Sequence, residues 1–211
     1  MRQGAYYFFS VILCKAKDLN EEKMKTIKDN EFIRGNVPMT KEEIRTISLA
    51  KLSLNEAETF WDIGSGTGSI AVQAAVSDKS LNIYAIEKND EGIELIGNNI
   101  AKFKADNIKP IKAEAPDYPE DIEVPDAAFV GGSGGRLREI VLDLKKRNPH
   151  IRIVINAVTL ETVSVIKELL EDDDIKNSEM IQLSVSRVQK IGSHHMLRAE
   201  TPVYVSLIEY V

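Results

Sequence analysis

The chain has 211 residues and a formal net charge of -6, a length that suits one doubly wound α/β domain with a sizeable core. An acidic chain offers no overall positive field to a phosphate backbone, so its composition does not favour nucleic acid as a partner. Its single cysteine, Cys14, cannot form an internal disulfide, and no Cys/His cluster has the spacing of a zinc site, so we expect no metal and a reducing, cytoplasmic environment.

Residues 1–28 are predicted to be an extension ahead of the domain, which we place at residues 29–211. The extension contains an apolar run, Ala5 to Cys14, that is too short to cross a bilayer and is followed by no small-residue cleavage site. We interpret the run as a strand or an appendage and expect no membrane association. Because Met24 is a second candidate start, residues 1–23 are expected to be dispensable.

From Thr40 onward, helical and strand patterns alternate, which is typical of a parallel sheet with crossover helices. The first helix is predicted to start at Thr40, because Thr40 and Glu43 have the spacing of a capping box. The predicted strands are Glu58–Ile63, Asn82–Glu87, Lys109–Ala113, Asp126–Val130 and Ile151–Val158. The predicted helices that follow them are Ser69–Val76, Asp90–Lys104, Leu137–Arg147 and Leu160–Leu170.

The end of the chain departs from this alternation. Two strand-like segments, Glu179–Gln189 and Pro202–Tyr210, have no helical pattern between them and predict a long antiparallel hairpin. A dinucleotide-binding fold tends to close with another crossover unit, whereas class I methyltransferases end in an antiparallel strand pair. We therefore predict a doubly wound, mostly parallel, seven-stranded Rossmann-like sheet with a C-terminal antiparallel hairpin, which is the class I methyltransferase fold.

A glycine-rich loop follows the first predicted strand, at the edge of the sheet where ligands bind. The loop comprises Gly64, Ser65, Gly66, Thr67 and Gly68, and Asp62, which lies just before it, is predicted to bind the cofactor together with the loop. Glycine lets the backbone approach a ligand closely, and the next helix presents free amides and a positive dipole end to a carboxylate. In the nicotinamide fingerprint Gly-x-Gly-x-x-Gly the third glycine comes one position later, so the spacing favours S-adenosylmethionine over a dinucleotide.

Three more residues are predicted to complete the cofactor site. Glu87 ends the second strand about twenty residues after the loop, where an acidic side chain can accept hydrogen bonds from both ribose hydroxyls. The alternative for Glu87 is an exposed charge at a strand end. Ala115 follows the third strand and offers a backbone amide to the adenine ring. Thr40 either contacts the cofactor or only caps its helix.

A second glycine cluster, residues 131–135, follows the fourth predicted strand. It either lets a flat molecule approach the backbone or is a flexible turn. Enzymes that methylate the amino groups of bases usually have an Asn/Asp-Pro-Pro-aromatic motif at this place. Methylation of pyrimidine C5 in RNA needs a nucleophilic cysteine, and Cys14 lies outside the predicted fold. Because both features are missing from the predicted fold, the hypothesis that the methyl acceptor is a nucleic acid is weakened.

These features together resemble one family, the decarboxylating cobalt-precorrin C15-methyltransferases of anaerobic corrinoid, or vitamin B12, synthesis. The resemblance covers roughly residues 29–210, and its specific part is the second glycine cluster combined with the run Asn156–Thr162. The segments that carry it are Glu31–Arg34, Val37–Thr40, Gly64–Gly68, Val130–Gly135, Asn156–Thr162, Ser186–Arg187, Gly192–Leu197 and Pro202–Tyr204.

The resemblance implies methyl transfer from S-adenosylmethionine to C15 of cobalt-precorrin-6B, loss of carbon dioxide from the ring C acetate, and a homotetramer. It implies cofactor contacts at Thr40, Gly64 to Gly68, Glu87 and Ala115. The residues predicted to bind the tetrapyrrole are Gly132, Ser133, Gly134, Arg136, Asn156, Thr159, Arg187 and His195.

Arginine forks suit a substrate with many carboxylates, which makes Arg136, Arg187 and Arg198 candidates, with surface ion pairs as the alternative. His194 or His195 either donates the proton that decarboxylation needs or is solvated in a turn. No catalytic residue is assigned. Two other functions stay open, because related folds serve many substrates. One is a methyltransferase that acts on RNA or protein, and the other is a non-catalytic subunit that binds S-adenosylmethionine.

Overall fold

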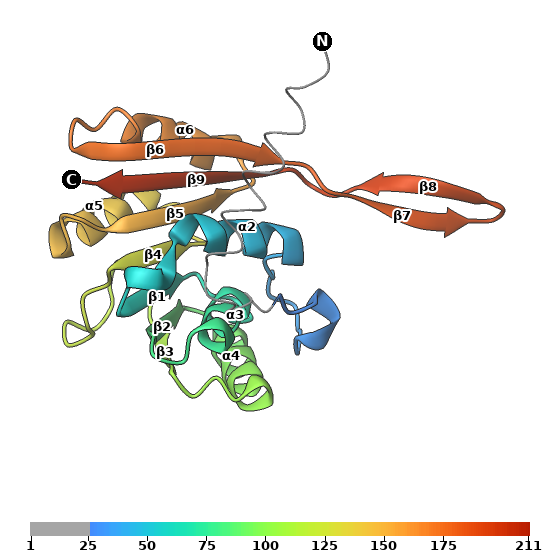
Figure 1. Cartoon of the computed structure of the whole chain (residues 1–211), viewed down its shortest axis with the longest axis horizontal. Helices are drawn as coiled ribbons and strands as arrows, with labels where there is room; N and C mark the ends of the chain where they lie inside the picture. Colours follow the sequence, from blue (N-terminus) through green and yellow to red (C-terminus); the bar gives the residue numbers. More distant parts are fainter. Residues whose placement is uncertain (1–25) are drawn as a thin grey trace, which may run out of the picture.

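The computed structural model describes residues 26–211, which form a seven-stranded sheet covered by helices and a two-stranded ribbon that projects from it (Figure 1). The apolar run Ala5 to Cys14 and the second candidate start, Met24, lie outside the described residues. Within residues 26–211, the helices are all too short or too polar to span a membrane.

The sheet has the strand order β3-β2-β1-β4-β5-β9-β6, and its first five strands in sequence are parallel. Their bounds are β1 Thr59–Ile63, β2 Asn82–Glu87, β3 Ile108–Lys112, β4 Ala127–Val130 and β5 Arg152–Ala157. The last strand, β9 (Val203–Tyr210), lies antiparallel between β5 and β6 (Ile175–Leu183). The predicted fold class and the five predicted parallel strands are confirmed.

Strand order reverses between β1 and β4, because the chain first builds outward to β3 and then returns to the other side of β1. Open α/β sheets bind ligands at such a reversal, beyond the carboxyl ends of the strands. Both faces of β1 are buried, and successive residues serve opposite layers: Phe60 belongs to one apolar cluster and Trp61 to the other. The strand beside the reversal, β1, is therefore covered by side chains on both faces of the sheet.

The helices divide between the two faces of the sheet. One apolar cluster contains residues of α2 (Glu42–Leu52), α3 (Ser69–Ser77) and α4 (Asp90–Phe103), and the other contains residues of α5 (Leu137–Arg147) and α6 (Leu160–Leu169). Short 3-10 turns, η1 (Asp29–Glu31) and η2 (Leu54–Glu56), flank α2. This arrangement places the amino ends of α3, α5 and α6 directly after strands that end at the ligand edge.

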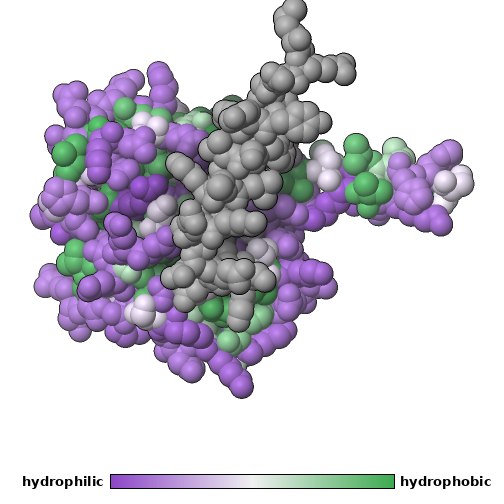
Figure 2. Space-filling view, viewed as in Figure 1, coloured by the Kyte–Doolittle hydropathy of each residue, from purple (hydrophilic) through white to green (hydrophobic). Residues whose placement is uncertain are grey.

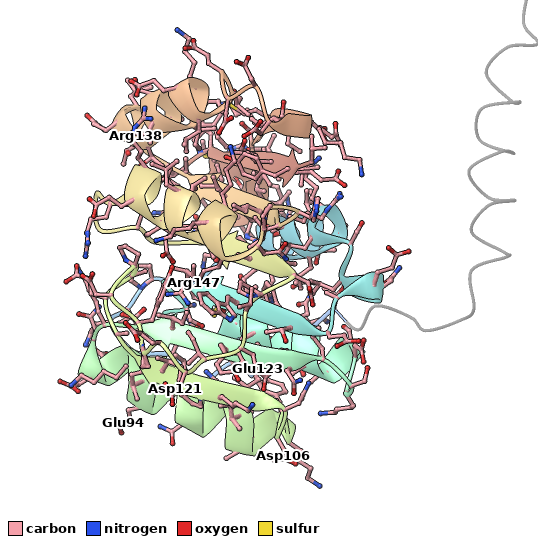
Figure 3. The ribbon with its side chains drawn as sticks, turned by 90° about the vertical axis from the view of Figure 1, so that its left-hand side faces the viewer. Glu94, Asp106, Asp121, Glu123, Arg138 and Arg147 are labelled. Atoms are coloured by element: carbon pink, nitrogen blue, oxygen red, sulfur yellow. The ribbon has the colours of Figure 1, made fainter. Side chains whose placement is uncertain are left out.

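Side-chain contacts hold the sheet at the amino ends of its central strands, opposite the ligand-binding side. Arg147, at the end of α5, lies over the rings of Trp61 and Tyr118 at 5.6 and 5.1 Å, and the carbonyl of Glu123 accepts from Trp61 Nε1 at 3.0 Å. Figure 3 labels Arg147 and Glu123 in this region. These contacts fix the amino ends of the central strands and leave the carboxyl ends for function.

The predicted capping box at Thr40 is wrong. The helix α2 begins at Glu42, its N-cap is Lys41, and no side chain caps it. Instead, the buried Arg45 donates from Nη1 to the carbonyl oxygen of Thr40 at 2.6 Å. This contact holds Thr40 in the incoming segment, ahead of the helix.

The C-terminal hairpin is longer than predicted and has two stages. The predicted strand Glu179–Gln189 is divided at residues 184–185, so that β6 pairs with β9 while β7 (Ser186–Ile191) pairs with β8 (His194–Ala199). The β7-β8 ribbon extends away from the sheet (Figure 1) and carries exposed apolar side chains (Figure 2). The break separates the hairpin into a part that completes the sheet and a part that is exposed.

Candidate active site

The glycine loop after β1 is formed by close backbone contacts. Gly64 and Gly66 have φ angles of +69° and +59°, a region that favours glycine. A Cβ on Gly66 would lie 2.7 Å from the carbonyl oxygen of Pro38, and one on Gly64 would lie 2.4 Å from that of Gly132. The loop is therefore in contact with the segment before α2 on one side and with the second glycine cluster on the other.

Asp62 supports the glycine loop by accepting hydrogen bonds on its buried side chain. Its Oδ2 accepts hydrogen bonds from Ser65 Oγ at 2.6 Å and from the amide of Ala71 at 3.1 Å. The side chain is buried, and burial raises its pKa to about 7. Its Oδ1 is buried without a hydrogen-bond partner among the described residues. Asp62 and Ser65 thus shape the loop and do not line the cavity above it.

Thr67 and Gly68 also act through the shape of the loop. Thr67 is buried, and its carbonyl oxygen accepts from Asn99 Nδ2 at 2.9 Å. Gly68 is the N-cap of α3 and has a φ of +76°. These two residues join the loop to α3 and α4, and neither lines the cavity.

Glu87 is held against the loop at the end of β2. Its Oε2 accepts from the amide of Gly66 at 2.9 Å, and its Oε1 accepts from the amides of Lys88 and Asn89, both at 2.9 Å. The residue is 6% exposed, so the alternative of an exposed charge at a strand end is wrong. The Glu87 carboxylate therefore links the end of β2 to the loop after β1, and Glu87 also lines the cavity described next.

The first cavity lies beyond the ends of β1 to β4 and has a volume of about 200 Å³. Of the residues predicted to bind the cofactor, Gly64, Gly66, Glu87 and Ala115 line it, and Thr40 does not. The remaining lining residues are Val37, Pro38, Ile63, Ile86, Lys88, Asn89, Ala113, Glu114 and Gly131 to Gly134.

Sequence reasoning missed two parts of this first cavity. Val37 and Pro38 form one wall of the cavity. The signal that could have predicted this wall is the segment Val37–Thr40, which carries part of the family resemblance. Lys88 and Glu114 form an ion pair of 2.9 Å between the ends of β2 and β3. Single charged residues after strands give no local signal of such a pair, because it depends on which strands are neighbours.

A second cavity of about 350 Å³ lies on the other side of the second glycine cluster. Residues 131–134 line both cavities and so form their common wall. Five of the residues predicted to bind substrate line the second cavity, namely Gly132, Ser133, Gly134, Asn156 and Thr159. The structure thus brings together the loops after β4 and β5.

Hydrogen bonds fix two of these side chains. Asn156, on β5, has its Oδ1 3.1 Å from the hydroxyl of Ser48 on α2. Thr159 is the N-cap of α6, and its Oγ1 accepts from the amide of Thr162 at 3.2 Å. Both residues present fixed polar groups at the carboxyl end of β5.

Arg136, Arg187 and His195 line neither cavity. Arg136 pairs with Asp117 and with Glu139, and Arg187 pairs with Glu43 at 2.8 Å and Glu200 at 2.6 Å. The alternative of surface ion pairs therefore describes both arginines as the structure places them. His194, His195 and Arg198 lie on the exposed strand β8, and the turn itself is formed by residues 192–193.

The comparisons with known proteins agree with this geometry. The precorrin methyltransferase domain model matches residues 31–209. A relative from Sulfurisphaera tokodaii, named probable cobalt-precorrin-6B C(15)-methyltransferase (decarboxylating), is 38% identical over 189 residues, which are 87% of this chain and 96% of the relative. A relative from Salmonella typhimurium, named cobalt-precorrin-6B C(15)-methyltransferase (decarboxylating), is 34% identical over 181 residues, 85% of this chain and 93% of the relative.

Solved structures show the same fold. Precorrin-6y C5,15-methyltransferase from Geobacter metallireducens has a TM-score of 0.81 and 34% identity, and the match covers 88% of this chain and 98% of that one. A precorrin-8w decarboxylase from Methanobacterium thermoautotrophicum has a TM-score of 0.78 and 29% identity, with 86% and 98% covered. Both matches span nearly the full length of the solved chains.

Proposed function

The chain belongs to the precorrin methyltransferase family, and from this premise we propose that it methylates C15 of cobalt-precorrin-6B and removes carbon dioxide from the ring C acetate. The names of the two curated relatives support this reaction. The observation that carries the proposal is the pair of adjoining cavities that share residues 131–134 as a wall. Methyl transfer requires direct contact between the methyl group and the acceptor carbon, so the two reactants would meet at the open edge of this shared loop, where the two cavities adjoin.

S-adenosylmethionine is the proposed occupant of the first cavity. The residues present fit this ligand, because glycines at positions 64 and 66 let the loop pack against the backbone of Gly132 and Pro38, where a Cβ would collide, and so leave loop backbone lining the cavity. Glu87 offers carboxylate oxygens for the ribose, and Ala115 offers a backbone amide for the adenine. When bound, S-adenosylmethionine supplies the methyl group as an electrophile. Asp62 and the other buried loop residues would support the site from beneath.

The tetrapyrrole is the proposed occupant of the second cavity. Gly132, Ser133, Gly134, Asn156 and Thr159 would contact it, because all five line the space on the far side of the common wall. The acceptor is a carbon of an electron-rich conjugated ring, so no strong base is needed to create a nucleophile. Orientation and exclusion of water at the wall would provide most of the advantage for methyl transfer. Arg136, Arg187 and His195 remain predictions that these two cavities do not use.

The main rival is a methyltransferase with another acceptor, such as RNA or a protein side chain. A net charge of -6 does not favour RNA. A non-catalytic subunit would also keep the first cavity. Turnover separates these cases, because only the proposed enzyme converts the corrinoid intermediate.

The test is incubation of the full chain with cobalt-precorrin-6B and methyl-labelled S-adenosylmethionine, followed by mass analysis. We expect a product that has gained one labelled methyl group and lost one carboxyl group. Gly66→Val is the control, because its side chain would collide with the backbone of Pro38 and should abolish cofactor binding in calorimetry. Cofactor binding by the parent chain without conversion of this substrate would show that the acceptor is a different molecule.

A further inference from the structure

The second cavity contains one ionisable side chain, Glu161. The other side chains that line it are apolar or neutral and polar, and much of the remaining wall is glycine backbone. Glu161 lies in the first turn of α6, between Thr159 and Thr162, whose hydroxyl oxygens are 2.9 Å apart. Among residues 26–211, Glu161 forms no ion pair. Glu161 is also exposed, so its carboxylate is accessible to a ligand in this cavity.

We propose that Glu161 is the catalytic residue that moves the proton linking methylation to decarboxylation. The inference rests on the proposed function, since it assigns a role within that reaction. It follows from the position of Glu161 in the cavity assigned to the tetrapyrrole and from the proton balance of the reaction. Neither histidine of β8 has such a position, because both lie on the exposed ribbon outside the cavities.

The two chemical steps release and consume one proton each. At C15, a bond to the methyl carbon forms and the C–H bond breaks, and the electron pair of that C–H bond restores ring conjugation. At the ring C acetate, the bond between the methylene carbon and the carboxylate breaks and carbon dioxide leaves. The electron pair passes into the macrocycle and then forms a new C–H bond at the former methylene carbon, which becomes a methyl group.

A single carboxylate satisfies this balance without another reactant. Glu161 enters ionised, accepts the proton that C15 releases, and donates a proton to the former acetate carbon. Both carbons belong to one flat molecule, so one side chain at the edge of the cavity can serve both. Formation of the bond between the methyl group and C15 needs no base, so methylation comes first and both proton transfers by Glu161 follow it.

A negative charge in a cavity for a polycarboxylate needs compensation, and two helix ends provide it. Leu137, the first residue of α5, and Thr159, the N-cap of α6, both line the cavity. The first amides of a helix have no acceptor within it, and the amino end of the helix carries partial positive charge. These groups offset the repulsion between Glu161 and substrate carboxylates.

A purely structural role for Glu161 makes a different prediction. A glutamate in the first turn of a helix stabilises the helix slightly through its interaction with the helix dipole. In that case a substitution would lower thermal stability slightly and leave both chemical steps unchanged.

The test is Glu161→Gln in the full chain, with Glu171→Gln as the matched control. Glu171 is exposed, follows the same helix and lies outside both cavities, so its variant should behave like the parent. For Glu161→Gln we expect decarboxylation to slow by about 100-fold or more, the usual range for general acid–base groups. A methylated species that retains the acetate carboxylate should accumulate. Cofactor affinity in calorimetry should equal that of the parent.

Two results would overturn the proposal: parental rates of both steps, or recovery of unreacted substrate with both steps slowed equally. Glu161→Asp keeps the carboxylate and the charge, so it should restore part of the decarboxylation rate and serves if the glutamine variant does not fold. Failure of the parent chain to convert cobalt-precorrin-6B would contradict the proposed function itself, and this outcome is read before any variant is compared.

Discussion

Asp62 illustrates how a residue beside a cofactor loop can act without touching the cofactor cavity. Its position just before the glycine loop predicted a binding residue, and the structure places it under the loop, where one carboxylate oxygen accepts from Ser65 and Ala71. Because the other oxygen is buried without a partner among residues 26–211, a proton on that oxygen would leave both hydrogen bonds intact. Burial accordingly raises the pKa of Asp62 to about 7.

The raised pKa predicts a pH dependence of stability. The pKa of an aspartate is 3.8 without the fold and about 7 within it, so between these values the folded chain holds a proton that the unfolded chain has lost. The free energy of unfolding should therefore fall as the pH rises through this window, by up to roughly 4 kcal/mol. Asp62→Asn keeps both hydrogen bonds through its carbonyl oxygen and should remove this slope, as measured by denaturant unfolding at several pH values.

Asp117→Asn is the control for this measurement. Asp117 is exposed, and its pairing with Arg136 lowers its pKa, so its contribution to stability is present above the unfolded pKa and lost as the pH falls. The slope assigned to Asp62 should persist in this variant. Parallel pH profiles for the parent and for Asp62→Asn would show that the buried carboxyl does not titrate in this window.

At the scale of elements, the contact between the loops after β1 and β4 is asymmetric. A Cβ on Gly64 would lie 2.4 Å from the carbonyl oxygen of Gly132, and the φ of Gly64 is +69°. A Cβ on Gly132 would have Gly64 Cα as its nearest neighbour at 3.8 Å, an ordinary contact distance. The same pair of loops therefore tolerates a methyl group on one side and not on the other.

This asymmetry predicts opposite outcomes for two alanine variants. Gly64→Ala should force the loops apart and weaken cofactor binding by at least tenfold, because the backbone cannot yield as a flexible side chain would. Gly132→Ala should fold like the parent and bind the cofactor within a few-fold of parental affinity. Calorimetry and thermal unfolding of both variants provide the measurement. Equal affinities for the cofactor in the two variants would contradict the assigned loop contact.

The elements that sequence predicted best are those whose pattern is local. The inner parallel strands β1, β2, β4 and β5 read as apolar runs because they are buried on both faces, whereas the edge strand β3 is largely exposed. The strand β2 matches its predicted bounds, Asn82–Glu87. The break at residues 184–185 was not predictable in this way, because β-like residues continue through it and only the choice of partner strand changes. The capping motif at Thr40 failed for a similar reason, since the buried Arg45 determines where that segment lies.

The candidate site shows the same division. The glycine loop and Glu87 were predictable because their chemistry follows from their position after a strand. Gly64, Gly66 and Glu87 all line the first cavity. The ion pair of Arg187 with Glu43 was not predictable, because the two residues are 144 positions apart in the chain. Pairing of charges across such separations depends on the assembled fold.

At the scale of the whole molecule, the segment before α2 is part of the domain. Ile27 is buried, and its carbonyl oxygen accepts from the fully buried Arg45, which also bonds to Asp29 and Gln73. Further along, Val37 and Pro38 form a wall of the first cavity. Among residues 26–211, packing thus begins at Ile27, just before the boundary at residue 29 expected from the sequence.

This packing predicts different outcomes for two truncations. A chain that begins at Met24 should fold and bind the cofactor like the parent, because it keeps every described contact from Ile27 onward. A chain that begins at Arg34 should be less stable by about 3 to 5 kcal/mol, because it leaves Arg45 buried without the carbonyl of Ile27 and the carboxylate of Asp29.

Denaturant unfolding and calorimetry of the two truncated chains test this contrast. Loss of folding in the chain that begins at Met24 would show that the apolar run Ala5 to Cys14 packs against the domain, and residues 1–23 would then not be dispensable. Arg45→Met, made in the chain that begins at Arg34, separates the two causes of instability, because it removes the buried charge and keeps a long apolar side chain. It should recover part of the lost stability, and no recovery would assign the loss to the apolar contacts of Ile27 and Phe32 instead.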